Sequence, residues 1–362
     1  IGAACGLVGT LFHFGVHEVT AFRGTHPWVL YLLPLAGLVI VGFYKLTGTD
    51  GLGTDDIIDA VHQGKLLPIL LLPAIFFGTI LTHLCGGSAG REGAALQMGG
   101  TIGQYLGRHF QLDDRDLRVA TLAGMAAFFS ALFGTPLAAT VFAIMVISIG
   151  VIYHVALYPS LLAALVAYGV SIHLGVEPTR FAVSVPEQTV GMFVRVALLG
   201  VLCALVSILF CQVMHGAGHL MKRIRNPWLR VVCGGAAIIV LTLIFGTDYN
   251  GAGMEIVTAA VEQGIVAVPW AFLLKLIFTA ITLAAGFKGG EVVPSFFVGA
   301  TFGCAAAPLL GLPAGFGAAV GLAAVFCGVT NCPLASTLLA VELFGAEGLL
   351  YFALACCLSY ML

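Results

Sequence analysis

The stretch GGSAGREGAALQMGG, residues 86–100, places an arginine and a glutamate side by side within a very apolar chain. Glycines surround the pair and leave the backbone amides uncovered, and a helix is expected to begin around Glu92 to Ala95. The N-terminus of a helix carries roughly half a positive charge and several N–H groups without partners. This stretch therefore predicts an anion site that needs no cationic side chain in contact.

The composition around this stretch is that of a membrane protein. Of the 362 residues, 60% are hydrophobic and 9% are charged, and the mean hydropathy is +1.07. A soluble domain has about 45–50% apolar and about 25% charged residues. Five stretches approach the ~20 apolar residues that cross ~30 Å of hydrocarbon: 28–44, 66–84, 194–213, 231–245 and 270–286. The 47 glycines and 14 prolines interrupt them, which predicts an all-α integral membrane protein of short, tilted and broken helices.

An internal repeat organises the chain. Landmarks recur in the same order at a shift of 200 residues, or of 197 for the last pair. The pairs are HPWV (26–29) with NPWL (226–229), GLGTDDIIDAVHQG (51–64) with GAGMEIVTAAVEQG (251–264), GREGA (90–94) with GEVVP (290–294), and GMAAFFSALFGTPLAATVFA (124–143) with GLAAVFCGVTNCPLASTLLA (321–340). Self-similarity of this kind predicts two repeat halves, 1–185 and 186–362.

The distribution of charge predicts that the two halves have opposite orientations. MKRIRN (221–226) is the densest cationic loop, which the positive-inside rule places in the cytoplasm. Its repeat mate around FRGTHP (22–27) has a single arginine and is expected outside. In such inverted repeats, broken helices from both halves point their ends at a site near the bilayer midplane.

Two further helix starts opened by glycine resemble the one at residue 90. GGEVVPSFF (289–297) is its repeat mate, with Pro294 near the first helical turn, where no N–H is needed. GTDGLGTDD (48–56) begins a third helix near Thr54. We expect the three starts, drawn from both halves, to converge on one small anion.

These residues resemble the CLC family of chloride channels and anion/proton antiporters, whose signatures G-S-G-I-P, G-(K/R)-E-G-P and G-x-F-x-P stand at helix starts around the pore. The corresponding residues are Gly51, Leu52, Gly53 and Thr54; Gly90, Arg91, Glu92, Gly93 and Ala94; and Gly290, Glu291, Val292, Val293 and Pro294. The resemblance covers essentially the whole chain. It implies a homodimer, each subunit with its own pore, spanning the inner (plasma) membrane of a bacterium many times.

The resemblance also assigns roles to these residues. Glu92 would be a gating glutamate that occupies an anion site when ionised and leaves it when protonated. Burial opposes its ionisation and helix ends favour it, so its proton occupancy can change near neutral pH. Pairing of Glu92 with Arg91 alone is the alternative, although adjacent helical side chains do not face each other, and Arg91 is expected to have a structural role. The implied anion-binding positions are Gly51, Leu52, Gly53, Arg91, Gly93, Ala94, Val292 and Val293.

Departures from the family motifs indicate a subgroup. Leu52 stands where the family has a serine, Ala94 replaces a proline, and Glu291 adds an acid to the third motif. This combination resembles the CLC antiporters that exchange fluoride for protons, whose third motif reads G-G-E-V-x-P. Val293 departs from the threonine usual in that subgroup. The interpretation is a fluoride/proton antiporter in which Glu291, expected at depth in the membrane, joins the proton route or shapes the anion site; an N-terminal cap is its alternative role.

A second departure concerns proton delivery from the cytoplasm. Chloride/proton antiporters of the family keep a glutamate on the helix of TPLAATVFAIMVISIG (135–150), where this chain has Met145 and Val146. Val146 fits a fluoride exporter, whereas an acid is expected at Met145 in that subgroup. The repeat mate of this helix carries Glu342. The family's pore tyrosine falls beyond residue 362, and Tyr351 and Tyr360 are not obvious substitutes.

Other functions were weighed against this interpretation. A chloride/proton antiporter or a passive chloride channel of the same fold is an alternative, because a fold does not decide the function it carries. An enzyme is not expected, since the chain has neither H-E-x-x-H nor G-x-S-x-G. No cofactor is implied, and the histidine pairs at 13/17 and 215/219 lack a third metal ligand. The net charge of −2 excludes a nucleic-acid partner.

Overall fold

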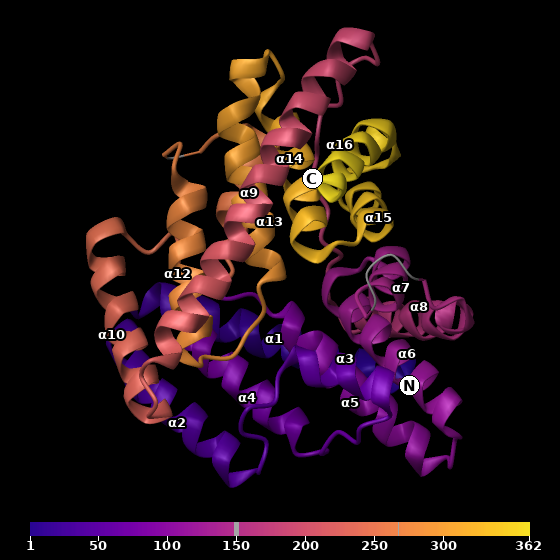
Figure 1. Cartoon of the computed structure of the whole chain (residues 1–362), viewed down its shortest axis with the longest axis vertical. Helices are drawn as coiled ribbons and strands as arrows, with labels where there is room; N and C mark the ends of the chain where they lie inside the picture. The colour runs from indigo at the N-terminus through magenta and orange to yellow at the C-terminus, as the bar shows by residue number, and fades with distance from the viewer. Residues whose placement is uncertain (148–151, 267) are drawn as a thin grey trace.

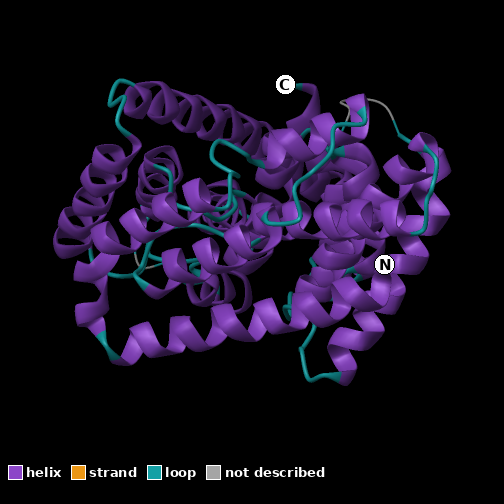
Figure 2. Ribbon diagram, turned by 90° about the horizontal axis from the view of Figure 1, so that it is seen from below, coloured by secondary structure: helices purple, strands orange, loops and turns teal. Residues whose placement is uncertain are grey.

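The structure, a computed structural model, describes residues 1–147, 152–266 and 268–362. Over these residues it has sixteen α-helices and no strand, which confirms the all-α class (Figures 1 and 2). The helices are α1 (Gly2–Thr25), α2 (Leu33–Leu46), α3 (Thr54–Gln63), α4 (Leu71–Leu84), α5 (Glu92–His109), α6 (Asp114–Phe133), α7 (Pro136–Met145), α8 (Leu157–His173), α9 (Val190–Lys222), α10 (Pro227–Phe245), α11 (Met254–Thr258), α12 (Ala271–Ala285), α13 (Val292–Ala306), α14 (Ala314–Thr330), α15 (Pro333–Phe344) and α16 (Leu349–Met361). Short 3₁₀ turns are η1 (Pro27–Leu32), η2 (His154–Ala156), η4 (Ala307–Leu310) and η5 (Ala346–Gly348), and a π turn is η3 (Ala259–Gln263).

The order of helices in the first half recurs in the second. Helices α4, α5, α6 and α7 have α12, α13, α14 and α15 as their counterparts at the repeat shift. The joint before the last helix of each series is built alike: α6 ends at Gly134 (φ 69°) and α14 at Asn331 (φ 55°), both in the left-handed region. The next helix begins with Pro136 or Pro333, at the position where a missing N–H costs nothing.

Six helical segments of the described chain are long and apolar enough to cross a membrane. They are Pro27–Leu46, Asp114–Phe133, His154–His173, Val190–Lys222, Pro227–Phe245 and Val292–Leu310. The other apolar helices have 10–17 residues, shorter than the ~20 that span the hydrocarbon core. The chain is therefore a membrane protein of long and short helices, as its glycines and prolines predict.

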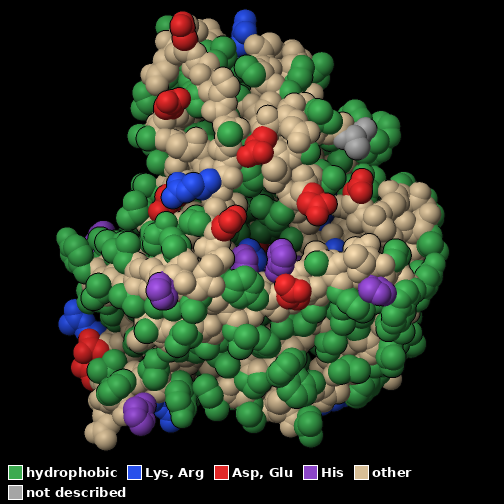
Figure 3. All heavy atoms as spheres, turned by 180° about the vertical axis from the view of Figure 1, so that it is seen from behind, with side chains coloured by type: hydrophobic (Ala, Val, Ile, Leu, Met, Phe, Trp, Pro, Cys, Tyr) green, Lys and Arg blue, Asp and Glu red, His purple; other side chains and the backbone are tan. Residues whose placement is uncertain are grey.

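Apolar side chains cover much of the outer surface. Exposed leucines and valines stand on α9 and α10, among them Val194, Leu198, Leu205, Val240 and Leu243. Figure 3 shows hydrophobic side chains over the flanks of one face, with charged and histidine side chains gathered around a hollow near its middle. A surface of this kind suits lipid around the flanks and water at the hollow.

Glycines bring the helices that follow the two charged motifs into backbone contact. On α5, Gly99 and Gly103 face Gly124 and Ala120 of α6; a Cβ on Gly99 or Gly103 would strike a carbonyl oxygen of the other helix. Their repeat mates do the same between α13 and α14: Gly299 and Gly303 face Gly321 and Gly317. This small-xxx-small pattern lets membrane helices approach closely.

Candidate functional site

The two charged motifs meet backbone to backbone. The Gly90 N–H donates to the Gly290 carbonyl at 2.7 Å, and the Gly290 N–H donates to the Gly90 carbonyl at 2.8 Å. Each glycine thus donates one backbone hydrogen bond to its repeat mate and accepts one from it. Reciprocal contacts of this kind arise at a local two-fold axis.

Threonine hydroxyls next to the Gly90–Gly290 pair make a second set of reciprocal bonds. The Ser88 N–H donates to Thr282 Oγ1 at 3.1 Å, and the Lys288 N–H donates to Thr82 Oγ1 at 3.2 Å. Thr82 and Thr282 are repeat mates, as are Ser88 and Lys288. The loops that lead into α5 and α13 are therefore held by equivalent bonds from opposite halves.

The Glu92 carboxyl crosses from one half to the other. Glu92 is the first residue of α5 and is fully buried. Its Oε2 accepts a hydrogen bond from the Val293 N–H, at the start of α13, at 3.2 Å. Its Oε1 is buried and has no hydrogen-bond partner within the described residues. A carboxyl of the first half therefore lies at the helix N-terminus of the second half, where an anion is favoured.

The third helix start joins the other two at Gly93. A Cβ placed on Gly93 would lie 3.2 Å from the Gly290 Cα and 3.6 Å from Thr54 Oγ1, at the first residue of α3. Thr54 Oγ1 accepts a hydrogen bond from Gln97 Nε2 of α5 at 3.0 Å. The starts of α3, α5 and α13 thus lie together, as the sequence predicts.

Within the first motif the backbone donors are engaged locally. The Gly53 N–H donates to Asp56 Oδ2 at 2.9 Å, and the Leu52 N–H donates to the Thr49 carbonyl at 3.2 Å. Gly51 has φ 82°, a conformation that glycine adopts without strain. The Leu52 side chain packs partly buried against the core. In this conformation Leu52 and Gly53 offer no free N–H, and an anion-binding role for Gly51, Leu52 and Gly53 stays a prediction.

Arg91 turns away from Glu92. Its Nη1 lies 3.0 Å from His13 Nδ1 of α1, and its guanidinium lies 5.7 Å from the Phe133 ring centre. Its Nη2 donates weakly, at 3.5 Å, to the Leu132 carbonyl. No ion pair joins Arg91 to Glu92 among the residues that the structure describes. This placement fits the structural role expected for Arg91.

The remaining motif residues separate into buried and exposed groups. Ala94, Val292 and Val293 are buried. Glu291 precedes α13 and is exposed, and its side chain makes no capping hydrogen bond to that helix. The Glu92 side chain is buried and that of Glu291 is exposed on this subunit, and the depth of the two residues in the membrane stays a prediction.

Three basic side chains lie close to the paired loops, and the motifs did not reveal them. Lys275 of α12 is fully buried and donates to the carbonyls of Tyr249 (3.1 Å) and Gly251 (2.6 Å). Arg23 of α1 donates to the His83 carbonyl at 2.5 Å. The buried His83 ring lies 3.4 Å from the Gly90 carbonyl. The available signal was a lone lysine in the apolar run AFLLKLIFTA, since a charge inside a membrane helix is costly and marks function.

Glu342 serves a helix of the other half. Its Oε1 and Oε2 accept hydrogen bonds from the N–H groups of Leu137 (3.1 Å) and Ala138 (2.8 Å), at the start of α7. Met145 ends α7 and Val146 follows it; residues 148–150 of that stretch lie outside the described residues. The first half therefore has no acid at the end of α7. Glu342, the repeat mate of Met145, instead caps the beginning of α7.

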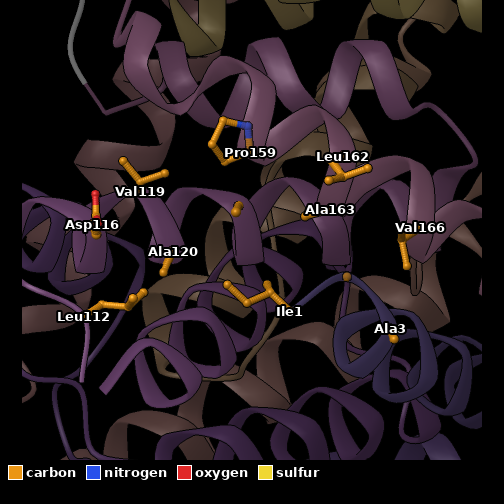
Figure 4. Close-up of a pocket in the computed structure, with 12 residues that line it drawn as sticks. Ile1, Ala3, Leu112, Asp116, Val119, Ala120, Pro159, Leu162, Ala163 and Val166 are labelled. Atoms are coloured by element: carbon orange, nitrogen blue, oxygen red, sulfur yellow. The ribbon is translucent and has the colours of Figure 1, made fainter. Parts of the chain in front are cut away.

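One apolar cavity lies away from these motifs. It has a volume of about 630 Å³ and is lined by the start of α1 and by α6 and α8 (Figure 4). Its walls are apolar, with Val119, Leu162 and Val166 among them, and Asp116 is the only charged side chain. None of the motif residues lines it, so this cavity is separate from the meeting of the three helix starts.

A chain of apolar helices in two reciprocal halves, with a buried carboxyl where helix ends meet, defines a membrane protein built on an inverted repeat. The family model described as voltage gated chloride channel matches residues 36–362. The chain belongs to this family, the CLC family.

Individual relatives agree with this assignment. A chloride/fluoride channel protein of Pseudomonas syringae pv. tomato is 39% identical over 100% of this chain and 82% of that protein. The H(+)/Cl(-) exchange transporter ClcA of Vibrio cholerae is 27% identical over 95% of this chain and 80% of that protein. The crystal structure of a CLC-type fluoride/proton antiporter superimposes with a TM-score of 0.96 at 34% identity, over 100% of this chain and 92% of that one. A slow cyanobacterial Cl-/H+ antiporter shares the fold, with a TM-score of 0.84 at 20% identity, over 99% of this chain and 91% of that one.

Proposed function

We propose that this protein is a fluoride/proton antiporter that exports fluoride and that Glu92 is its gating glutamate. The observation that carries the proposal is the bond from the Val293 N–H to the buried Glu92 carboxyl. An ionised Glu92 and a halide compete for the same helix N-terminus, because both are anions that this N–H can bind. Protonation of Glu92 weakens its hold on that N–H and opens the place to the halide.

The exchange of fluoride suits this site chemically. Fluoride is compact and strongly hydrated, so it needs close donors to replace lost water. The N–H groups at the starts of α5 and α13, from Gly93, Ala94, Val292 and Val293, are the candidate donors. The likeness to the fluoride/proton antiporter and to the chloride/fluoride channel protein supports this choice. The likeness to a chloride exchange transporter keeps chloride/proton antiport and passive chloride conduction as alternatives.

We further propose that the protein works as a homodimer in the inner membrane of a bacterium. The matched relatives from Pseudomonas and Vibrio are bacterial. Each subunit holds a complete meeting of the three helix starts, so each has its own pore.

The test is an efflux assay in proteoliposomes with matched fluoride and chloride gradients. We expect faster fluoride efflux, together with proton movement against the proton gradient when fluoride flows down its own gradient. Chloride efflux equal to or faster than that of fluoride would overturn the fluoride assignment. Fluoride efflux without coupled proton movement would indicate a channel.

Replacing Leu52 with serine is expected to let more chloride through. The substitution restores the hydroxyl that the chloride branch of the family carries in this motif, and chloride is well served by such a donor. The chloride-to-fluoride efflux ratio of Leu52→Ser is the measurement, with Leu52→Ala as the control for lost side-chain volume. An equal ratio in the two variants would remove Leu52 from the selectivity of the site.

Replacing Glu291 with glutamine is expected to slow transport without unfolding the protein. Because the Glu291 side chain is exposed, glutamine keeps its size and removes its charge outside the core. Turnover and selectivity are measured in liposomes, and size-exclusion chromatography reports assembly. Unchanged turnover and selectivity would leave Glu291 outside the transport path.

A further inference from the structure

The Thr54 hydroxyl is a hydrogen-bond donor at the point where the three helix starts meet. Thr54 Oγ1 accepts the Gln97 amide hydrogen at 3.0 Å. Among the described residues this hydroxyl donates to no acceptor, although a hydroxyl has one donor hydrogen. Thr54 is half-buried, and threonines within helices return that hydrogen to their own helix, as Thr101 does to the Gln97 carbonyl at 2.7 Å. Thr54 is the first residue of α3, so no earlier turn of its helix can accept the hydrogen.

A second group without a partner belongs to the residue next to Gly93 in the chain. Glu92 Oε1 is fully buried and has no hydrogen-bond partner within the described chain. A buried polar atom left without a partner is costly, which points to a proton or a ligand that completes it. Gly93 directly follows Glu92, and a Cβ on Gly93 would lie 3.6 Å from Thr54 Oγ1, so the two groups belong to the same meeting of helix starts.

We propose that Thr54 is an anion-binding residue that selects fluoride and that Gln97 positions its hydroxyl. The inference rests on the proposed transport function. With its oxygen held by Gln97, the hydroxyl can turn its hydrogen only toward another acceptor. Fluoride is the stronger hydrogen-bond acceptor of the two halides, so a fixed O–H at this place favours it over chloride. A protonated Glu92, next to Gly93 in the chain, would offer fluoride a further O–H.

Gln97 is suited to this positioning role by its place on α5. It is buried, with 8% of its surface exposed, and lies on the same helix as Glu92. A second glutamine one heptad further along, Gln104, binds the chain that follows α3: its Oε1 accepts from the Leu67 N–H at 2.7 Å, and its Nε2 donates to the Lys65 carbonyl at 2.9 Å. The two amides therefore fix α3 against α5 at both of its ends.

Thr54→Val is the decisive variant because it keeps the shape of the side chain and removes the hydroxyl. Thr101→Val is its matched control, and Thr54→Ser retains the donor. Fluoride and chloride efflux are measured in proteoliposomes, and fluoride binding to the purified protein is measured by calorimetry. We expect Thr54→Val to lower fluoride affinity and efflux by about tenfold, as for the loss of one hydrogen bond to a charged group. Chloride efflux should fall less, and Thr54→Ser and Thr101→Val should stay within about twofold of the wild type.

The outcomes separate this inference from the proposed function. Fluoride efflux and selectivity equal in Thr54→Val and Thr101→Val would overturn the role of Thr54 while leaving the antiporter intact. A wild-type protein that moves chloride and no fluoride would overturn the fluoride antiporter, and equal chloride efflux in the two variants would then overturn the role of Thr54 as well. If Thr54→Val does not purify as a folded protein, Thr54→Ala takes its place under the same criteria. Gln97→Leu, which leaves the hydroxyl but frees it, should lower fluoride affinity by less than Thr54→Val; a loss equal to or larger than that of Thr54→Val would overturn its positioning role.

Discussion

Glu92→Gln is expected to reduce anion-driven proton movement to the background of protein-free liposomes. Glutamine keeps the size of the side chain but cannot take up or release a proton at any working pH. The buried carboxyl at the start of α13 is the titratable group that both halves of the site contact, so proton coupling should end with it. The measurement is the pH change inside liposomes when a fluoride gradient is imposed.

Glu18→Gln is the matched control for this experiment. Glu18 is an exposed glutamate on α1, 3.8 Å from the exposed His17, and its loss should leave coupling unchanged. Anion efflux is measured in the same preparations, since a folded Glu92→Gln protein should still bind and move anions. Coupled transport at the wild-type ratio in Glu92→Gln would remove Glu92 from the proton route.

Much of this site was predictable because it depends on residue types and on their spacing in the sequence. Gly90, Glu92 and Pro294 mark helix starts in the sequence, and the repeat shift predicts that the motif around Gly90 meets the one around Gly290. The reciprocal Gly90–Gly290 bonds agree with that prediction. The apolar composition likewise predicted the class of fold, because lipid as a solvent leaves few alternatives to helices.

The rest was not predictable, for physical reasons that differ from residue to residue. The partner of Glu92 is the backbone N–H of Val293. Since nearly every residue type has a backbone N–H, the residue type at position 293 does not reveal this bond. Glu291 is exposed whereas the next residue, Val292, is buried, because the direction of a side chain at a helix start depends on tertiary packing. Lys275 binds two carbonyls of a loop far away in sequence. The residue pattern of a single helix does not predict a contact with a distant loop.

The packing of α5 on α6 gives the largest expected effect on stability. A Cβ on Gly124 would strike the Gly99 carbonyl oxygen and lie 3.0 Å from the Gly103 Cα. Both obstacles are backbone atoms of a neighbouring helix, so no change of rotamer relieves them and the helices must separate. Gly124→Ala is therefore expected to lower the free energy of unfolding by about 1–3 kcal/mol, as overpacking does, and Gly124→Leu should not yield folded protein.

Gly169→Ala tests whether the effect of Gly124→Ala comes from packing or from glycine as such. Gly169 lies in α8, and a Cβ there would meet no atom within 4 Å. Alanine at an open helical position should raise stability by about 0.5–1 kcal/mol, because glycine loses more backbone entropy on folding. Gly321→Ala, at the repeat mate of Gly124, should destabilise like Gly124→Ala, since its Cβ would meet the Gly299 carbonyl oxygen and lie 2.9 Å from the Gly303 Cα. The unfolding temperatures of the three variants are measured in detergent. If Gly124→Ala and Gly321→Ala unfolded at the same temperature as Gly169→Ala, close contact through glycine would not hold the helices of either half together.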